Sequence, residues 1–242
     1  MKQITEGVFF IQGRDEMIPD AHVYGVGKPS SQDLTLVDAG LMGKGRYKIE
    51  AIQKLGLPLT DIKRIIMTHT HYDHCGTLAE LKELTGAQIM VQSEEAANLR
   101  EGFTPLPRGT RWYSKAIVFL GDRLLPSSAG SFDPVESDIV VEGSCDLNQY
   151  DLPGEAIHTP GHTAGSLSIL VDGEHALVGD TMFHIFKNSA MPPFANDVPE
   201  LLGSWERLLE TGCERFYPGH GSPFSRDLLE QSLDKEKKKY LR

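Results

Sequence analysis

Short apolar or alternating runs that end in glycine recur in the first forty residues. They are GVFFIQG (7–13), HVYGVG (22–27) and LTLVDAG (34–40). Runs of this length, closed by a residue that favours turns, are typical of β-strands. The chain therefore opens with a predicted meander of three strands.

Helical spacing and strand-like runs then alternate up to residue 100. Tyr47, Ile49 and Ile52 recur at roughly helical intervals, and Ser93 precedes two acidic residues as an N-cap does. The predicted elements are a helix after Gly43 with a cap at Gly56, a buried strand at 62–68, a helix at 77–86, a strand at 88–93 and a helix capped by Ser93.

The segment 103–132 breaks this regularity. It contains Pro105, Pro107, Gly109 and Pro126, residue types that interrupt helices and strands. Two interpretations stay open: an insertion that covers or borders the functional site, or a surface excursion with no part in it. We predict an irregular insertion, which also leaves room for a homodimer contact.

The second half repeats the strand pattern of the first. We predict strands at 138–143, 155–161, 166–173 and 175–181 that together form a second sheet. An amphipathic helix at 198–212, a strand and turn at 215–221 and a terminal helix at 227–242 complete the predicted elements.

Length, charge and cysteine content narrow the range of functions. The 242 residues are enough for a large core, and we expect one domain over residues 1–242. With 24 basic and 34 acidic residues, the formal charge is −10, which disfavours a nucleic-acid partner. No apolar run resembles a signal sequence or a membrane span, so we expect no membrane partner and a cytoplasmic location. Three scattered cysteines fit a reducing compartment.

The strand at 62–68 leads into THTHYDHCG (68–76), which has three histidines and an aspartate within six positions. Buried imidazoles and carboxylates are costly unless something satisfies them, and a bound cation does so. His69 and His71, at i and i+2, share one face of an extended chain. Asp73 and His74 are adjacent, so the backbone must turn to present both of them to a second cation position.

Three more residues of ligand type end apolar strands in glycine-rich turns. HTPGHTAGS places His162, LVGDT places Asp180 and YPGHG places His220. Glycine lets the backbone approach a site closely. One such histidine is usually a plain surface or core residue, but five histidines and two aspartates together predict a metal centre.

With these motifs, the chain resembles the metallo-β-lactamase-fold hydrolases from its early strands through PGHG. The resemblance implies an α/β fold, the four-layer αβ/βα sandwich, with the site at one edge between two sheets. It also implies the ligand sets: His69, His71 and His162 for one metal, Asp73, His74 and His220 for the other, and Asp180 as the carboxylate that bridges both.

Departures from individual branches narrow this resemblance. Asp180 stands where true zinc β-lactamases of this fold place a cysteine or histidine, and His71 stands where flavodiiron proteins place a glutamate. Quorum-signal lactonases typically carry a tyrosine shortly after the bridging aspartate, where this chain offers Phe183, His184 and Phe186. Glyoxalase II enzymes add a C-terminal helical region. No branch fits fully, and we group the chain with the glyoxalase II and lactonase-like branch rather than with true β-lactamases.

The expected activity is that of a dinuclear metal-dependent hydrolase. Two divalent metal ions, with zinc first and iron or manganese as alternatives, hold a bridging hydroxide in such enzymes. Asp73 is the expected catalytic residue, as acceptor of the water proton. The expected substrate is a small molecule with an ester, thioester or lactone bond, and a phosphodiester comes next.

Two other interpretations stay open. A mononuclear iron dioxygenase of thiols or persulfides resembles this chain at His69, His71, His162 and Asp180, because histidines and a carboxylate suit ferrous iron. A regulatory protein of the same fold would bind a ligand with weak activity.

Some residues outside the ligand sets are also candidates for the site. Candidates for substrate contact are His184, Phe183 and His22. Candidates for orienting the imidazoles are Thr68, Thr70 and Thr163. We expect Cys75 to be a small buried thiol, and His158 and His175 to be structural.

Overall fold

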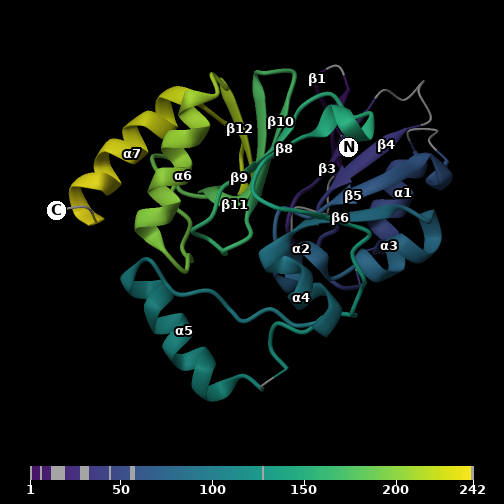
Figure 1. Cartoon of the computed structure of the whole chain (residues 1–242). Coiled ribbons are helices and arrows are strands. Elements are labelled where there is room, and N and C mark those ends of the chain that lie inside the picture. Colours follow the sequence, from purple (N-terminus) through teal and green to yellow (C-terminus); the bar gives the residue numbers. More distant parts are fainter. Residues whose placement is uncertain are drawn as a thin grey trace.

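Two β-sheets form the centre of the computed structural model, which describes residues 2–5, 7–11, 20–27, 33–43, 45–54, 58–126 and 128–240 (Figure 1). The first sheet has seven strands in chain order. They are β1 (Lys2–Thr5), β2 (Val8–Ile11), β3 (Val23–Val26), β4 (Leu34–Val37), β5 (Ile62–Ile66), β6 (Gln88–Gln92) and β7 (Ile139–Val141). Strands β1 to β4 pair antiparallel, which confirms the predicted meander, and β4 to β7 pair parallel.

The second sheet has six strands in the order β13-β12-β11-β10-β9-β8. They are β8 (Cys145–Asp146), β9 (Glu155–His158), β10 (Leu167–Val171), β11 (His175–His184), β12 (Arg215–Gly221) and β13 (Phe224–Ser225). Strands β11 and β12 are parallel, and the other neighbours are antiparallel.

One strand lies in a different sheet from the one we expected. The run at 138–143 was expected in the second sheet, but β7 pairs with β6 of the first sheet, with Met90 opposite Ile139. Apolar patterning identifies a strand but does not identify its partner, which depends on tertiary packing. The second sheet therefore begins with β8.

Helices cover the outer face of each sheet (Figure 1). The helices are α1 (Gly45–Gln53), α2 (Tyr72–Cys75), α3 (Leu78–Thr85), α4 (Ser93–Glu101), α5 (Trp112–Leu124), α6 (Val198–Glu210) and α7 (Arg226–Tyr240), with short 3₁₀ turns at Leu59–Asp61 and Leu147–Tyr150. Helices α1, α3 and α4 pack on the first sheet, and α6 and α7 on the second. None of the helices in the described ranges is both long and apolar enough to cross a membrane.

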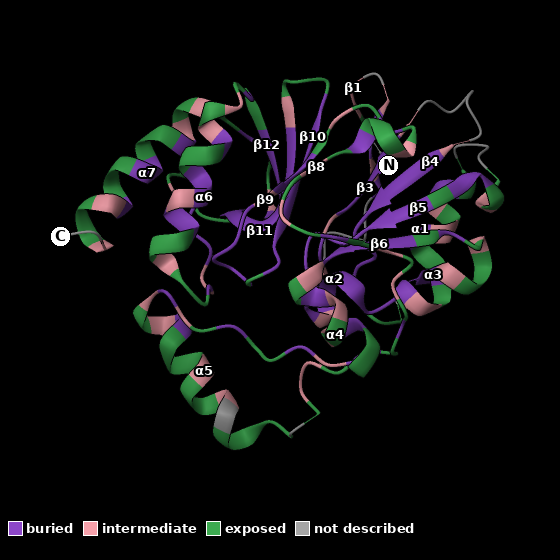
Figure 2. Ribbon diagram, viewed as in Figure 1, coloured by how far each residue is buried: buried purple, intermediate pink, exposed green. Residues whose placement is uncertain are grey.

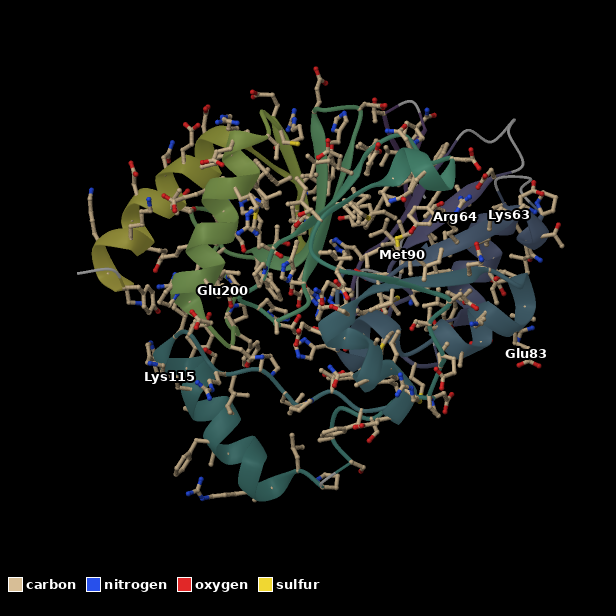
Figure 3. All side chains as sticks on the ribbon, in the orientation of Figure 1. Lys63, Arg64, Glu83, Met90, Lys115 and Glu200 are labelled. Carbon is tan, nitrogen blue, oxygen red and sulfur yellow. The ribbon has the colours of Figure 1, made fainter. Side chains whose placement is uncertain are left out.

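Three apolar layers separate the sheets and helices. Alternate residues of one strand point to opposite layers, as Ile65 packs towards the helices and Ile66 towards the second sheet. Met90 of β6 belongs to the middle layer with residues of both sheets (Figure 3), and the strands are buried while the outward helix faces are exposed (Figure 2). The predicted four-layer α/β sandwich is confirmed.

Two local predictions need correction. Helix α4 is capped by Gln92 and not by Ser93, because the Gln92 side chain accepts a hydrogen bond from the Glu94 N–H. The segment 103–132 is not irregular throughout, because it contains the 13-residue helix α5. Its prolines flank that helix without interrupting it. Gln12, Gly13, Gly56 and residues 241–242, at the ends of predicted elements, lie outside the described residues.

Candidate metal centre

The HTHYDH motif folds as a loop followed by one helical turn. Strand β5 leads into the loop that carries His69 and His71, and α2 carries Asp73 and His74. The His74 N–H donates to the carbonyl of His71 at 2.9 Å, which closes the turn. The predicted change of direction after His71 is therefore confirmed.

The second sheet contributes the other three candidate ligands. His162 lies in the loop between β9 and β10, whereas Asp180 and His220 lie inside β11 and β12. Their predicted placement in turns is wrong, because both strands continue through glycine. The β11–β12 register shifts between Gly179 and Phe183, and a glycine in a strand often marks such an irregularity.

Asp180 lies between the histidines of two groups. Its Oδ2 atom is 3.6 Å from Nε2 of His162 and 4.0 Å from Nε2 of His69. Its Oδ1 atom is 3.2 Å from Nε2 of His74 and 3.7 Å from Nε2 of His220. Each carboxylate oxygen therefore faces a different pair of imidazoles.

Three groups of side chains bring their ligand atoms within 4.8 Å of one another and could each hold a metal ion. The groups are His69, His71 and His162; His69, His74 and Asp180; and Asp73, His74 and His220. The structure thus brings together all seven residues that the sequence singled out as metal ligands, and all seven are buried.

Hydrogen bonds on the far side of two rings leave the inner nitrogen available. Nδ1 of His162 lies 2.9 Å from the carbonyl of Phe194, and Nδ1 of His74 lies 2.8 Å from Oδ2 of Asp38. Carbonyl and carboxylate oxygens only accept, so each Nδ1 carries the proton. The Nε2 atoms then carry the lone pair that can bind a cation, and Nε2 of His162 lies 2.9 Å from Nδ1 of His71.

Several inward atoms have no hydrogen-bond partner among the residues that the structure describes. Nε2 of His69, Nε2 of His74 and Oδ1 of Asp180 are buried without a hydrogen bond. Such atoms cost free energy unless another group satisfies them. Imidazole nitrogens with carboxylate oxygens suit zinc, iron and manganese, so the donor set fits a divalent cation.

Gly219 makes room for this arrangement. A Cβ at that position would lie 2.4 Å from Oδ1 of Asp180 and 2.6 Å from Cε1 of His74. Both distances are too short for any side chain, so β12 can approach the centre only with glycine there.

Burial dominates the electrostatics of the histidine-only group. Desolvation lowers the pKa of His71 to about 4 and that of His162 to about 4. Desolvation, with added repulsion from His74 and His162, holds the pKa of His69 well below its usual value. These rings are therefore neutral at pH 7, which is the form that binds metal.

Carboxylates dominate the other group. Burial alone would lower the pKa of His74 and of His220, but Asp180 and a second carboxylate near each ring outweigh it and raise both values. Burial alone would raise the pKa of Asp73 and of Asp180, yet the neighbouring histidines lower both. A bound cation would take the place of the protons that these imidazoles hold.

Asp38 is a site residue that the sequence did not reveal. It accepts hydrogen bonds from the Thr68 N–H at 2.8 Å and the Thr68 hydroxyl at 2.8 Å, as well as from His74. Its backbone has a φ of 65°, a conformation that aspartate tolerates better than most residues. The signal available in the sequence was a carboxylate directly after an apolar strand.

Glu95 was also missed. Its buried carboxylate accepts from the Thr70 N–H at 3.2 Å and the Gly165 N–H at 3.2 Å, and it bonds the Thr70 hydroxyl. It therefore ties the loop of His69 and His71 to the loop of His162. A glutamate in the first turn of a helix normally suggests only a favourable charge, which hid this role.

The three candidate threonines have different surroundings. Thr68 is confirmed as a partner of an imidazole, because its Oγ1 lies 3.1 Å from Nδ1 of His69. The hydroxyl of Thr70 bonds Glu95, and the hydroxyl of Thr163 lies 2.8 Å from that of Ser166. The predicted contact with an imidazole is therefore borne out at Thr68.

The three candidates for substrate contact have different neighbours. The ring of Phe183 packs against that of His220 with centroids 4.8 Å apart. The backbone N–H of His22 donates to the carbonyl of Gly219 at 2.8 Å. Burial, with repulsion from His220, lowers the pKa of the His22 ring to about 4. His184 turns towards Ser222 and Phe224. Phe183 and His22 thus border the strand of His220, and His184 contacts the following turn.

The remaining candidates have structural partners. Cys75 is a free, buried thiol that donates to the carbonyls of Thr70 and His71. His158 bonds the carbonyl of Ala164, and His175 bonds the Tyr217 hydroxyl. These contacts agree with the expectations for all three residues.

The insertion at 103–132 borders the centre. The Thr104 hydroxyl donates to the carbonyl of Thr70 at 2.6 Å, and Gly109 forms a β-bridge with Phe194, the residue that accepts from His162. The segment therefore touches the loop of His69 and His71 and the residue that bonds His162, which favours the interpretation of an insertion at the site over a remote excursion.

Comparisons with known proteins agree with this geometry. Residues 22–220 match the metallo-beta-lactamase superfamily. The chain is 30% identical over 190 residues to the protein named Probable metallo-hydrolase MJ0888 of Methanocaldococcus jannaschii, with 77% of this chain and 82% of that protein covered. It is 28% identical to Acyl-coenzyme A thioesterase MBLAC2 of Gallus gallus, with 94% and 82% covered.

The fold is also similar to that of solved structures. BJP-1, a subclass B3 metallo-beta-lactamase of Bradyrhizobium japonicum, superposes with a TM-score of 0.69 at 22% identity, and 99% of this chain and 92% of that chain are covered. At this identity the likeness concerns the fold alone. With the matched superfamily and the clustered histidines and aspartates, we conclude that this chain belongs to the metallo-beta-lactamase superfamily.

Proposed function

We propose that this metal-dependent hydrolase is dinuclear and cleaves a small ester, thioester or lactone. The observation that carries the proposal is the position of Asp180, whose Oδ2 faces His162 and whose Oδ1 faces His74 at 3.2 Å. A carboxylate between two imidazole groups is suited to bridge two cations. The proposed first set is His69, His71 and His162, and the second is Asp73, His74 and His220.

The chain's own residues fix the conditions for this chemistry. Bound zinc, iron or manganese would lower the pKa of water and polarise the substrate oxygen. Asp38 and the Phe194 carbonyl hold two rings in the tautomer that presents Nε2 inward. Zinc is the first metal to test, because histidine and carboxylate oxygen are its common ligands.

Asp73 is the proposed proton acceptor. Its carboxylate is buried, and its pKa is lowered because the hydrogen bond and positive charge of His220 and the charge of His74 outweigh the effect of burial. It is therefore ionised at neutral pH and able to accept a proton. Its Oδ2 atom lies 3.2 Å from Nε2 of His220, so the same carboxylate faces the second ligand set.

A thioester is the first substrate class to test. The relative named acyl-coenzyme A thioesterase matches along 94% of this chain, which supports an acyl bond over a phosphodiester. Phe183 and His22, which border His220, are the proposed contacts for the group that carries this bond.

The test combines metal analysis with a substrate panel. We expect two divalent cations per chain, together with turnover of a chromogenic thioester, ester or lactone. The variant Asp180→Ala should lose both cations and, with them, the transition-state stabilisation that they provide. We expect turnover to fall by roughly 10³-fold or more, where each 1.4 kcal/mol of lost stabilisation is about tenfold. Asp234→Ala, an exposed change on α7, is the matched control and should leave both unchanged.

Three results would contradict the proposal. Full activity of Asp180→Ala would remove Asp180 from the site. A single iron per chain, with thiol-dependent oxygen uptake and no hydrolysis, would favour the mononuclear dioxygenase. Tight binding of a panel member without turnover by the metal-loaded chain would favour a regulatory protein.

A further inference from the structure

Helix α5 exposes its largest apolar side chains. Trp112 is 83% exposed, and Ile117, Phe119, Leu120 and Leu124 are each more than half exposed. Figure 2 shows α5 exposed along most of its length, and Figure 1 shows it extending away from the two sheets. Groups of large exposed apolar side chains mark interaction surfaces in soluble proteins.

The opposite side of α5 carries small residues. Ser114 is buried, and Val118 and Gly121, at i+4 and i+7 from it, are partly buried. A surface helix normally turns its apolar stripe towards its own core and its polar side outwards. Helix α5 has the reverse orientation, with apolar surface left for a partner.

Hydrogen bonds fix the start of α5 in this orientation. The Arg111 guanidinium donates to buried Glu236 of α7 at 2.6 Å, and the Tyr240 hydroxyl donates to the carbonyl of Thr110 at 2.8 Å. The Thr110 hydroxyl and N–H donate to the carbonyls of Pro192 and Pro193 at 2.6 and 2.9 Å. The exposure of the apolar side is therefore built into the fold.

The exposed surface has nearly the size that a protein interface requires. We call it the α5 face and define it as Trp112, Ile117, Phe119, Leu120, Leu124 and the exposed Phe186, whose ring lies 6.3 Å from that of Tyr113. At roughly 100 Å² for each half-exposed large side chain, these residues offer roughly 600 Å². A standard interface buries about 800 Å² per partner, and the flanking Tyr113 and Arg123 extend the face towards that area.

Charge and composition favour a protein partner, and specifically a second copy. The segment 102–132 contains one acidic and four basic residues, a charge of +3, which leaves −13 for the rest of the chain. Two copies of so acidic a chain repel each other, and the repulsion is weaker across a segment with few acids. Aromatic residues and arginine with few acids or lysines are also the composition of interface cores.

A lipid surface fits these observations less well. Recruitment to anionic membranes typically uses clusters of about four to eight basic residues. Of the four basic residues near the α5 face, Arg111 is already paired with Glu236. Lys115, near the start of α5, points to the surface (Figure 3). Together with Arg108 and Arg123 it makes three basic residues that could contact a lipid surface, fewer than such a cluster needs.

We propose that the α5 face is a homodimer interface, in which α5 of one copy packs against the same face of a second copy. The proposed interface is linked to the metal centre through the residues that precede α5. Thr104 contacts Thr70, and Gly109 contacts Phe194. Dimer formation would therefore restrain the loop that carries His71 and the segment of Phe194, whose carbonyl bonds His162.

The test measures molar mass by light scattering and analytical ultracentrifugation of the full chain between about 1 and 100 µM. We expect twice the 26.8 kDa of one chain. The double variant Ile117→Glu/Leu120→Glu should be monomeric with an unchanged circular dichroism spectrum. Leu84→Glu, at a 47% exposed leucine on α3, is the matched control and should remain dimeric.

Tryptophan emission gives an independent measure. The chain has two tryptophans, of which Trp112 is 83% exposed and Trp205 is fully buried. Dimer formation should shift the emission to shorter wavelength as concentration rises, and Trp112→Phe should remove that shift. A wild-type monomer at 100 µM, or a dimer that survives the double substitution, would overturn the proposal. Monomers that bind anionic vesicles through α5 would assign the face to lipid instead.

Discussion

Oδ2 of Asp38 lies 2.8 Å from Nδ1 of His74, so a buried carboxylate outside the HTHYDH motif sets the tautomer of a proposed ligand. The same carboxylate holds the N–H and hydroxyl of Thr68, whose Oγ1 lies 3.1 Å from Nδ1 of His69. Asp38 thus reaches one ring directly and another through a threonine. Its influence extends to both proposed metal positions.

Replacement of Asp38 by asparagine should weaken metal binding. The amide can no longer accept in the same way from His74 and Thr68, and loss of such a partner typically costs about 10- to 100-fold in metal affinity. Competition with a chromogenic chelator measures this affinity. Asp146→Asn, which changes a surface N-cap, is the control, and equal affinities for the two variants would contradict the assigned role of Asp38.

Replacement of Gly219 by alanine should disrupt the centre with little change elsewhere. The new Cβ would meet Oδ1 of Asp180 and Cε1 of His74 at 2.4 and 2.6 Å, so β12 must move away. We expect loss of at least one cation per chain by elemental analysis. Gly203→Ala, in α6 with no atom within 4 Å of the added Cβ, should retain both cations and gain up to about 1 kcal/mol in stability.

Replacement of Glu95 by glutamine should destabilise the fold. The carboxylate accepts from the N–H groups of Thr70 and Gly165, and an amide cannot reproduce this set of acceptors. A lost buried hydrogen bond to a charged group costs about 1.5 to 3 kcal/mol, which urea unfolding would detect. Glu94→Gln changes the exposed neighbouring glutamate and should be silent. A stable Glu95→Gln protein would show that the two loops are held together by other contacts.

The metal-free protein should lose stability as the pH falls from 6.5 to 4. The folded-state pKa of His71 and that of His162 are about 4, below the usual 6.5, so the unfolded chain binds more protons in this window. Each histidine then contributes stability above pH 6.5 that is lost towards pH 4, by up to about 1.4 kcal/mol per pH unit.

Urea unfolding of chelator-treated protein at pH 7 and pH 5 tests this dependence. We expect a lower midpoint at pH 5, and a smaller difference between the two midpoints for His71→Gln. The raised pKa of His74 acts in the opposite direction, since its contribution is lost as the pH rises above 6.5. A midpoint that is higher at pH 5 would show that His74 and His220 dominate.

The sequence predicts the members of the site better than their support. The seven candidate ligands are recognisable because histidine and aspartate are unusual at strand ends, whatever the fold. Asp38 and Glu95 resemble ordinary residues at a strand end and in a first helical turn. Their roles depend on contacts with residues at least 25 positions away, such as that between Glu95 and Thr70.

The fold is predictable to the same extent. Local patterns predict most strands and helices, but they did not assign β7 to the first sheet, because pairing with β6 is a tertiary choice. They did not predict α5 either, because the apolar residues of that helix face solvent. The residues of α5 do not show the apolar stripe that a helix normally turns towards its core, and the flanking prolines suggested a loop.

The ligand groups draw on both halves of the chain, with His69 and His71 from the first sheet and His162 from the second. Neither half alone could hold a cation in that group. Metal binding is therefore coupled to the docking of the two halves, and a ligand that binds only the folded state stabilises it by about 4 kcal/mol at a concentration of 1,000 times its dissociation constant. The supply of free metal around the protein would then set its lifetime against unfolding and proteolysis, as well as its activity.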